Sequence, residues 1–335
     1  MNLSGRTFVV TGGAGFIGSE LCRQIRARGA TVRIVDNLTN GKRDNIAGIL
    51  DDACHLHVAD IRELEVMKTL LQGCDAVFHL ACLGVRHSIH SPVENHEVNA
   101  TATLHLLRLA RDLDVPRFIH VSSSEVYGTA QCVPQPETHP TSPTTVYGAA
   151  KLAGECYARA FHHTYGYSTT IMRPFNSYGP RSHHEGDSGE VIPKFLLRAL
   201  AGKPMVIFGD GTQTRDFTFV SDTARGILEA GLAGNTIGET INIGSGIETS
   251  ISELANEVRM VTKLPQASII HEANRPGDVL RLCADTSQAR RLLGFEPRVR
   301  LRDGLAQLLA WYQAQDRPAE ELLQSEVVKN WEARS

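Results

Sequence analysis

The sequence predicts a doubly wound α/β fold, in which helices cover both faces of a parallel sheet. Three observations predict it. Short β-branched runs alternate with helical patterns through the first half of the chain. With 335 residues, the chain has room for about two domains and a sizeable core. Its hydrophobic fraction of 42% and charged fraction of 21% are typical of globular proteins.

The first elements follow in order along the chain. Between the β-branched runs lie stretches whose apolar residues recur at intervals of three and four, as Leu104, Leu107 and Ala110 do. The expected strands are Phe8 to Thr11, Thr31 to Val35, His55 to Ala59, Ala76 to Leu80, Phe118 to Ser122 and Thr169 to Arg173. The expected helices lie near 16–28, 63–73, 94–112 and 147–165. Right-handed crossovers between the strands give the doubly wound arrangement.

The pattern changes after Arg173, where Pro174, Gly179 and Pro180 interrupt it. We therefore expect a dinucleotide-binding domain over 1–175 and a smaller C-terminal α/β domain over 176–335, with part of 215–245 returning to pack on the first domain. In the second domain we expect strands at Val206 to Phe208 and Glu239 to Ile243. An amphipathic helix is predicted by the apolar stripe Leu301, Leu305, Leu308, Leu309 and Tyr312.

Composition and charge exclude several classes of partner. The formal net charge is -3, without the basic excess of a nucleic-acid binder. The chain has no run of about 18 apolar residues and no signal-like start, so we expect no membrane partner and a cytoplasmic location. Seven scattered cysteines without a C-x-x-C pair indicate free thiols in a reducing compartment. The paired histidines lack the third and fourth ligands of a zinc site, so we expect no metal.

A glycine-rich turn joins the first strand to the first helix. Its sequence runs Thr11-Gly-Gly-Ala-Gly-Phe-Ile-Gly18, with Gly12, Gly15, Phe16, Ile17 and Gly18 at the start of the helix. A dinucleotide pyrophosphate needs bare backbone here, because its oxygens bind N–H groups at the helix N-terminus. The spacing is one residue longer than the common G-x-G-x-x-G. The strand before it and the apolar helix behind it favour a Rossmann-type site.

The residue that closes the second strand favours NAD over NADP. The carboxylate of Asp36 can accept hydrogen bonds from a ribose diol and would repel a 2'-phosphate. The alternative is that Asp36 is a surface turn residue and that Arg33 and Lys42 hold a phosphate. Ligands of open α/β sheets bind at the carboxyl ends of strands, where Asp60 and Leu80-Ala81 also fall.

Tyr147 and Lys151 are four residues apart, which places a phenol and an ammonium on one face of a helix. A neighbouring cation favours the phenolate, so we expect the pKa of Tyr147 to move from about 10 toward neutrality. The pair can then remove a hydroxyl proton while a hydride leaves the same carbon. A serine of Ser122-Ser123-Ser124, after the fifth strand, could hydrogen-bond the same substrate oxygen.

Together these segments resemble the extended short-chain dehydrogenase/reductase family, specifically its NAD-dependent nucleotide-sugar epimerases and dehydratases. The matching segments are Gly12 to Gly18, Asp36, His79-Leu80-Ala81, Asn99, Ser122 to Gly128, Tyr147 with Lys151, Arg173 to Asn176, Gly209 to Gly211, Arg215 to Phe217, Asn242 to Gly244 and Arg275 to Asp278. The resemblance implies an NAD site made of Gly12, Gly15, Phe16, Ile17, Gly18, Asp36, Asn37, Asp60, Ile61, Leu80, Ala81, Asn99, Tyr147 and Lys151. It implies that residues 176–335 bind a nucleotide-diphosphate sugar.

The same resemblance implies the roles of the catalytic residues. Ser123 would orient the sugar 4-hydroxyl, Tyr147 would be the base, and Lys151 would tune it and hold the nicotinamide ribose. Asn176, Arg215 and Arg275 would bind the nucleotide diphosphate, a role that suits charge-assisted hydrogen bonds. The implied first step is oxidation at sugar C4 by NAD+. In relatives, the helices that begin near Glu94 and Tyr147 form a dimer interface, so we expect a homodimer.

Glu125 bears on the reaction that follows. It matches the glutamate of 4,6-dehydratases and uronate decarboxylases, where an acid group beside the sugar acts at C5. Ser124 stands where dTDP-glucose dehydratases have Asp, so Ser124 is a candidate proton donor only with help from water or Glu125. Glu125 as a structural partner of a backbone N–H or a cation is the alternative. These features favour 4,6-dehydration over 4-epimerisation, with uronate decarboxylation third.

Two further alternatives stay open. Gly84-Val85-Arg86 resembles a loop of UDP-sugar 4-epimerases, in which Arg86 could clamp a C6 carboxylate or only hold the loop. A non-catalytic NAD(H)-binding sensor would need the glycine turn but not Ser123, Tyr147 and Lys151.

Overall fold

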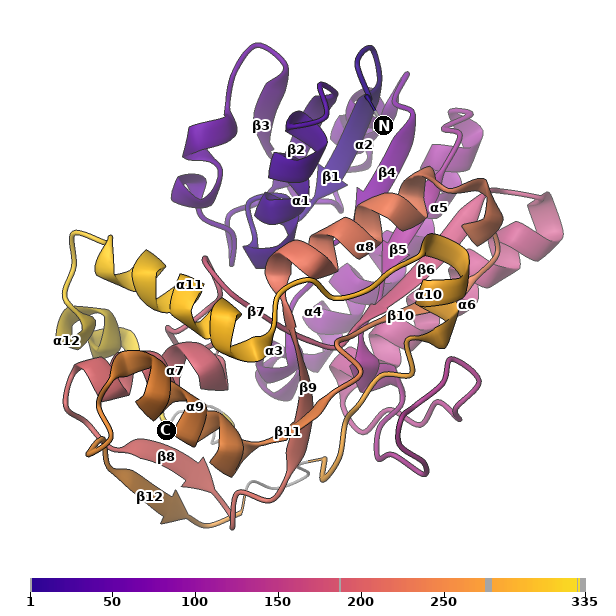
Figure 1. Ribbon diagram of the computed structural model, residues 1–335. Coiled ribbons are helices and arrows are strands. Elements are labelled where there is room, and N and C mark those ends of the chain that lie inside the picture. Colours follow the sequence, from indigo (N-terminus) through magenta and orange to yellow (C-terminus); the bar gives the residue numbers. More distant parts are fainter. Residues whose placement is uncertain (1, 187, 275–278, 330, 332–335) are drawn as a thin grey trace.

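The computed structural model describes residues 2–186, 188–274, 279–329 and 331. Its main element is a seven-stranded, all-parallel sheet in the order β10-β6-β5-β4-β1-β2-β3 (Figure 1). The strands are β1 (Thr7–Thr11), β2 (Thr31–Asp36), β3 (Cys54–Val58), β4 (Ala76–His79), β5 (Phe118–Val121), β6 (Thr169–Pro174) and β10 (Thr240–Ile243). The order reverses between β1 and β4, which makes the sheet doubly wound and confirms the predicted fold class.

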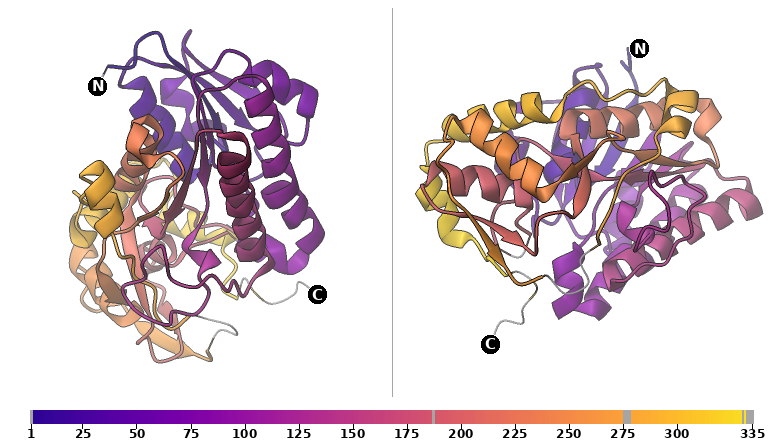
Figure 2. Two further views of the ribbon diagram at one scale, coloured as in Figure 1. Left: turned by 90° about the vertical axis from the view of Figure 1, so that its right-hand side faces the viewer. Right: turned by 60° about the horizontal axis from the view of Figure 1, so that its bottom comes forward.

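Helices cover both faces of the sheet, as the edge-on view in Figure 2 shows. One apolar core lies between the sheet and α1 (Phe16–Arg26), α8 (Val220–Leu232) and α10 (Ser287–Leu293). A second core lies on the other face, beneath α2 (Leu64–Leu71), α5 (Ala102–Asp112) and α6 (Val146–Tyr165). The buried central strands explain why the sequence shows continuous apolar runs rather than strict alternation.

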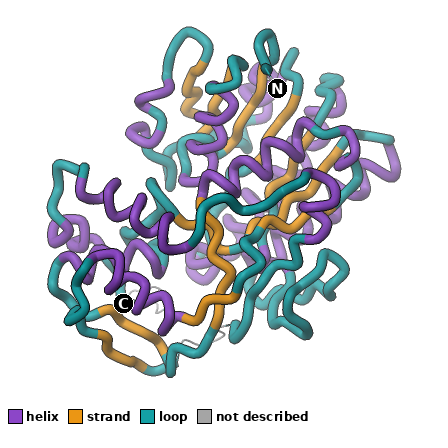
Figure 3. Tube along the Cα trace, in the orientation of Figure 1, coloured by secondary structure: helices purple, strands orange, loops and turns teal. Residues whose placement is uncertain are grey.

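The remaining elements form a smaller unit beside the carboxyl ends of the strands (Figure 3). It holds the three-stranded sheet β11-β9-β7, with β7 (Asn176–Tyr178), β9 (Thr214–Phe219) and β11 (Glu248–Ser250). It also holds the parallel pair β8 (Met205–Phe208) and β12 (Ile269–Glu272). A third apolar core joins these strands to α7 (Val191–Leu200), α9 (Ile251–Thr262), α11 (Leu301–Gln313) and α12 (Ala319–Leu322). Within 176–335, β10 belongs to the seven-stranded sheet, and α8 and α10 pack on it. The domain division at residue 175 stays a prediction.

The two helices expected at 94–112 and 147–165 differ from each other in regularity. The first is divided into α4 (Pro92–His96), a wider turn at Glu97–Thr101 and α5, and the short helix α3 (Val85–His90) precedes it. The second, α6, is continuous, because both of its ends are capped. The Thr145 hydroxyl accepts a hydrogen bond from the Gly148 N–H at 3.0 Å, and Gly166 ends the helix with a φ of 66°. This regular helix carries the Tyr147–Lys151 pair.

Candidate active site

A cleft of about 1260 Å³ lies between the seven-stranded sheet and the smaller unit. One half is lined by residues at the carboxyl ends of β1, β2, β4 and β5, and the other by residues of α7, β8 and β9. This is the edge at which open α/β sheets bind ligands. Every described residue of the expected site lines the cleft except Asn99. Arg275 lies outside the described residues.

The glycine turn has the bare backbone that the sequence predicted. Gly12 has a φ of 69°, and a Cβ added there would lie 2.7 Å from the Ala81 nitrogen. A Cβ on Gly18 would lie 2.1 Å from the Gly12 oxygen. A Cβ added to Gly15, just before α1, would make a tight contact of 3.1 Å with the Gly12 oxygen of the same turn. The turn therefore fits an anionic group held by backbone N–H groups.

Asp36 is buried at the end of β2, and backbone N–H groups donate to its carboxylate. Its carboxylate accepts hydrogen bonds from the N–H groups of Ala14 at 3.0 Å and Leu38 at 2.9 Å. Burial raises the pKa of this carboxyl, while these backbone bonds lower it. Arg33, offered above as a phosphate ligand, instead donates to the Leu70 and Gln72 carbonyls, both at 2.8 Å. The contacts agree better with a ribose diol than with a 2'-phosphate at Asp36.

Asn37 and Asp60 form a second polar group on the same edge. The Asn37 amide donates to the Asp60 carboxylate at 3.1 Å. The pKa of Asp60 is lowered to about 2, chiefly because Arg62 donates to it. Asp60 is therefore an acceptor at any physiological pH, and Ile61 beside it supplies an apolar wall.

Asn99 acts on the loop after β4 rather than on the cleft. Its amide oxygen accepts from the Leu83 N–H and its amide nitrogen donates to the Leu83 carbonyl, both at 2.9 Å. The side chain is 1% exposed. It therefore fixes the backbone next to Leu80 and Ala81, which do line the cleft. The resemblance implied a direct contact between Asn99 and the cofactor. In the structure, both amide atoms of Asn99 are instead hydrogen-bonded to the Leu83 backbone.

Tyr147 and Lys151 meet Ser123 and Glu125 in the middle of the cleft. The Ser123 hydroxyl accepts the Glu125 N–H at 3.2 Å, and it also interacts with the Tyr147 phenol. A Cβ on Gly148 would lie 2.8 Å from the Glu125 carbonyl oxygen, so the first turn of α6 packs tightly on the Glu125 backbone. Ser124 is buried beside them. The five predicted catalytic residues, Ser123, Ser124, Glu125, Tyr147 and Lys151, therefore all line the cleft.

The expected direction of the Tyr147 pKa differs from what the structure gives. Burial raises the pKa of the phenol well above its usual value, the charges of Cys82 and Glu125 raise it further, and Ser123 lowers it. Burial also lowers the pKa of the Lys151 ammonium, which is 1% exposed. The sequence argument counted the neighbouring cation but could not count desolvation, which here outweighs it.

From its place after the fourth strand, Cys82 could lie near the nicotinamide or serve only in packing, with packing favoured. The structure places it beside Tyr147 and Lys151. Cys82 is half-buried, lines the cleft and interacts with both the Tyr147 phenol and the Lys151 ammonium. Its position one residue beyond Ala81, at a strand's carboxyl end, was the available signal.

Three expected substrate-binding residues, Arg86, Asn176 and Arg215, line the cleft. The Arg215 guanidinium is fixed by two carbonyls, donating to Thr214 at 2.8 Å and Val279 at 2.7 Å. Sequence analysis did not single out Lys194 and Arg198 of α7, which line the same half. Periodicity shows only that α7 is amphipathic, and the two cations lie on its polar side.

Glu190, just before α7, is a further residue that sequence analysis missed. Its carboxyl lines the cleft, and burial raises its pKa to about 7, although His183 lowers it. A carboxyl that titrates near neutrality inside a cleft is typical of functional sites.

Two absences hold for the part of the chain that the structure describes. None of its helices combines the length and apolar character that a bilayer crossing needs. Within the same residues, no three His, Cys, Asp or Glu side chains come together as metal ligands would.

Fold and site together define a dinucleotide-binding protein of the dehydrogenase/reductase class. The family model described as GDP-mannose 4,6 dehydratase matches residues 9–308. The chain therefore belongs to the extended short-chain dehydrogenase/reductase family, in its NAD-dependent branch of nucleotide-sugar epimerases and dehydratases.

Relatives in this family carry three different reactions in their names. The chain is 35% identical to a UDP-glucose 4-epimerase of Mycolicibacterium smegmatis over 91% of this chain and 97% of that protein. It is 36% identical to UDP-glucuronic acid decarboxylase 2 of Arabidopsis thaliana over 90% of this chain and 67% of that one. The structure of a dTDP-glucose 4,6-dehydratase from Streptomyces venezuelae, with NAD and TYD bound, superimposes with a TM-score of 0.86 at 35% identity, covering 92% of this chain and 97% of that chain. Similarity alone does not separate the three reactions.

Proposed function

We propose that this protein binds NAD and a nucleotide-diphosphate sugar, oxidises the sugar transiently at C4, and acts as a 4,6-dehydratase. The observation that carries the proposal is the position of Glu125, whose carboxyl lines the cleft and is close enough to Tyr147 to raise the pKa of the phenol. A simple 4-epimerase needs no acid group at this place. A dehydratase needs a base at C5 and an acid for the leaving 6-hydroxyl.

The proposed NAD site is supported by the bare glycine turn and by Asp36. Gly12 and Gly15 donate their own N–H groups to the Val35 and Gly12 carbonyls, at 2.8 and 3.1 Å, so the first N–H groups of α1 are proposed to bind the pyrophosphate. Asp36 is proposed to accept hydrogen bonds from the adenosine ribose. When bound, NAD+ supplies the hydride acceptor and a positive charge near the phenol. Lys151 is proposed to hold the nicotinamide ribose, a role that its burial beside Tyr147 supports.

Tyr147 is proposed as the base that removes the proton of the 4-hydroxyl. Ser123, which interacts with the phenol and lowers its pKa, orients that hydroxyl. The raised pKa of Tyr147 means that positive charge must gather near the phenol before it ionises, and Lys151 supplies part of this charge. Ketone formation at C4 acidifies the C5 proton.

Glu125 is proposed to remove the C5 proton, after which the 6-hydroxyl leaves with a proton as water. Glu125 can return that proton itself, or Ser124 can relay it through water. Asn176 and Arg215 are proposed to hold the diphosphate, as is Arg275. Their half of the cleft also contains Lys194 and Arg198, but Arg198 pairs with Glu326 and Lys194 donates to the Val327 carbonyl, so the proposed diphosphate site depends on Asn176 and the two arginines named here.

Arg86 favours a second candidate, a UDP-sugar or uronate 4-epimerase. Arg86 lines the cleft on α3, beside the catalytic wall, where a guanidinium could pair with a C6 carboxylate. A UDP-glucuronate decarboxylase is the third candidate, because Glu125 also matches the glutamate of uronate decarboxylases. A non-catalytic NAD(H) sensor is the alternative from another class, and the shared wall of Ser123, Tyr147 and Lys151 argues against it.

Product analysis tests these candidates directly. Purified protein with NAD is incubated with UDP-, dTDP- and GDP-hexoses and with UDP-glucuronate, and products are followed by mass spectrometry and NMR. Loss of the mass of water identifies a dehydratase, and loss of the mass of carbon dioxide identifies a decarboxylase. An unchanged mass with a new anomeric signal identifies an epimerase, and no turnover of any sugar nucleotide favours the sensor.

Glu125→Gln tests the proposed C5 base. In D2O, the variant should lose deuterium incorporation at C5 while still forming some NADH, because Tyr147 and Ser123 remain. Glu65→Gln, an exposed substitution of the same kind on α2, is the matched control. Deuterium incorporation at the wild-type rate in Glu125→Gln would overturn the assignment of Glu125.

We also propose a homodimer through the helices that begin near Glu94 and Tyr147, in a reducing cytoplasmic compartment. The apolar residues Leu106 and Phe161 on these helices are buried within the chain, so they lend the dimer no support. Val93 and Val146 at the starts of these helices are 70% and 40% exposed and support it. All seven cysteines are free, which suits a reducing compartment. Light scattering of the purified protein measures the oligomeric state.

A further inference from the structure

The C-terminal segment, defined here as residues Ser325–Lys329 together with Trp331, lies against the substrate half of the cleft. Glu326, Val328 and Trp331 line the same cavity as Arg215 and Phe208. The segment begins beyond residue 308, where the family match ends. The motifs shared with relatives therefore do not account for its position.

Three contacts fix this segment to α7 and to the loop before it. The Arg198 guanidinium donates to the Glu326 carboxylate at 2.9 Å, and these side chains are only 10% and 7% exposed. The Lys194 ammonium donates to the Val327 carbonyl at 2.8 Å. The Gly186 N–H donates to the Ser325 carbonyl at 2.8 Å. A nearly buried, hydrogen-bonded ion pair holds a chain segment in one place far better than an exposed pair does.

Beyond these anchors, the Trp331 indole packs on Phe208 at the end of β8. The ring centroids are 4.6 Å apart and the rings are perpendicular. Both side chains line the cleft, as does Gln213 after β8. The indole is thus held edge-to-face by Phe208, the arrangement that aromatic pairs favour, with the cleft beside it.

The positions of the proposed sugar and diphosphate sites along the cleft indicate what would lie beside Phe208 and Trp331. If the reacting sugar carbon lies at Tyr147, the diphosphate must extend away from the glycine turn toward Asn176 and Arg215. The base of the nucleotide then lies beyond the cations, where Val206, Phe208, Gln213 and Trp331 line the cleft. Apolar rings with one amide suit a flat heterocycle that needs stacking and a few hydrogen bonds.

We propose that the C-terminal segment is part of the nucleotide-binding site and that Trp331 is the surface on which the base of the nucleotide sugar stacks. The stacking proposal rests on one part of the proposed function, the binding of a nucleotide diphosphate, and does not require the 4,6-dehydratase reaction. The segment is a wall of the site and not a plug in it, since its residues border the cavity. Base stacking tolerates any base, so Trp331 sets affinity, and Gln213 is left to distinguish bases by hydrogen bonding.

The test measures binding without turnover. The chain has two tryptophans, so in a Trp311→Phe background Trp331 is the sole indole reporter. UDP, dTDP and GDP are titrated separately into this protein with saturating NAD. The nucleotide that binds should change the Trp331 emission, because its base covers the ring. Inorganic pyrophosphate, which carries the charge but no base, should leave the emission unchanged.

Calorimetry on single variants gives the second measurement. Trp331→Ala should raise the Kd of the bound nucleoside diphosphate about 5- to 150-fold, the range typical of a lost base–aromatic stack. Trp331→Phe, the matched control, should stay near the wild-type Kd. Glu326→Ala removes the ion pair with Arg198 and keeps the indole, and it should also raise the Kd of the nucleoside diphosphate. In Trp331→Ala, the Kd of inorganic pyrophosphate should stay unchanged.

Three results would overturn the proposal: an unchanged Kd in Trp331→Ala, a tighter Kd that marks the segment as a block, or no binding of any of the three nucleotides. The proposed reaction fails separately. If nucleotides bind and Trp331→Ala weakens them, but no sugar nucleotide is converted, then the stacking surface stands and the 4,6-dehydratase assignment falls.

Discussion

Helix α6 carries two buried clusters of ionisable groups that differ in how completely they are hydrogen-bonded. Its first two turns hold Tyr147 and Lys151 at the cleft. One turn further on, along the same face of the helix, Glu155 is fully buried and does not line the cleft. The two clusters have the same backbone support and similar burial. What differs is the number of partners that each charge has.

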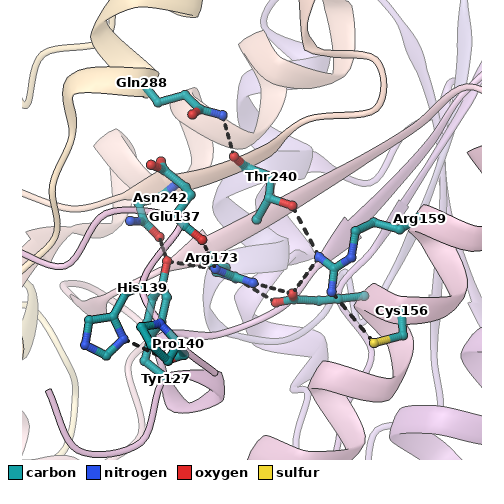
Figure 4. Close-up of polar contacts among 11 residues, drawn as sticks. Tyr127, Glu137, His139, Pro140, Cys156, Arg159, Arg173, Thr240, Asn242 and Gln288 are labelled. Atoms are coloured by element: carbon teal, nitrogen blue, oxygen red, sulfur yellow. Dashed lines mark hydrogen bonds and ion pairs between the residues drawn. The ribbon is translucent and has the colours of Figure 1, made fainter. Parts of the chain in front are cut away.

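The cluster around Glu155 is saturated. Arg173 donates to both carboxylate oxygens of Glu155, at 2.9 and 2.6 Å, and to the Tyr127 hydroxyl at 2.9 Å. Figure 4 shows how the network continues: Tyr127 donates to Asn242 at 2.7 Å, and the Asn242 N–H donates to Glu137 at 2.8 Å. Burial alone would raise the pKa of Glu155, but Arg173 holds it below its usual value.

The cluster around Tyr147 and Lys151 has the opposite balance. Burial raises the pKa of the phenol and lowers the pKa of the ammonium, so burial shifts both groups toward their neutral forms. No bidentate ion pair offsets the burial of either group among the described contacts. A paired charge such as Glu155 is locked in one protonation state, whereas groups pushed toward neutrality can exchange protons with a substrate. Hydrogen-bond saturation therefore separates the structural cluster from the reactive one.

Tyr147→Phe should have the largest effect on activity. Loss of the phenol oxygen removes the proposed base, so turnover should fall by about 10² to 10⁴-fold, the usual contribution of a positioned acid or base. Stability should change little, because the ring remains. Steady-state kinetics on the best sugar nucleotide gives the loss, and NAD binding by calorimetry is the control. Activity within a few fold of wild type would remove Tyr147 from the mechanism.

Arg173→Met should have the largest effect on stability. It leaves the Glu155 carboxylate buried without its main partner, which costs about 3 to 5 kcal/mol. The effect is measured as the free energy of unfolding in denaturant, with NAD bound. The double variant Glu155→Leu/Arg173→Met is the control and should recover most of the loss, since no buried charge remains. A single variant as stable as wild type would show that the saturated cluster does not hold the fold.

Part of this contrast was predictable from sequence. The glycine turn, Asp36 and the Tyr147–Lys151 pair are contiguous or one helical turn apart, so local spacing places them correctly. The first six strands were expected within two residues of their observed ends, because each is a short run that alternates with helical patterns. What sequence could not give is how deeply a group is buried. The predicted pKa direction of Tyr147 was wrong for that reason.

Contacts between distant segments were also beyond sequence reasoning. Arg198 and Glu326 are 128 positions apart, and neither residue lies in a motif. Arg173 belongs to a segment that matches the family, yet its pairing with Glu155 has no local signal. Asn99 shows a third limit, because a match to a family position did not tell whether the amide contacts a ligand or the neighbouring loop.

Glu190 extends the comparison to a third carboxyl, which is partly buried and has no guanidinium among the groups that shift its pKa. Its pKa is about 7 in the folded chain against 4.5 for the free side chain, so protonation favours folding. This stabilisation is complete below pH 4.5 and is lost as the pH rises through 7. Glu190→Gln should match wild type near pH 4.5 and exceed its unfolding free energy by about 1 to 3 kcal/mol at pH 8, less than the full shift because the carboxyl faces the cleft.

Denaturant melts of the NAD-bound protein across this pH range measure the Glu190 effect. Glu65→Gln, on the exposed face of α2, is the control and should show no pH-dependent difference. A difference between Glu190→Gln and wild type that stays constant from pH 4.5 to pH 8 would contradict the raised pKa of Glu190.

Arg159→Ala should have the smallest effect and is the sharpest check on saturation. Arg159 contacts the same carboxylate as Arg173, at 3.2 Å, from a side chain that is 33% exposed. Its other contacts are long, 3.4 Å to Thr240 and 3.7 Å to Cys156 (Figure 4). Because Glu155 keeps both bonds to Arg173, losing Arg159 should cost no more than about 0.5 kcal/mol of unfolding free energy. A cost above about 2 kcal/mol would mean that Glu155 needs both guanidinium groups, and that charge balance, not bidentate pairing, distinguishes the two clusters on α6.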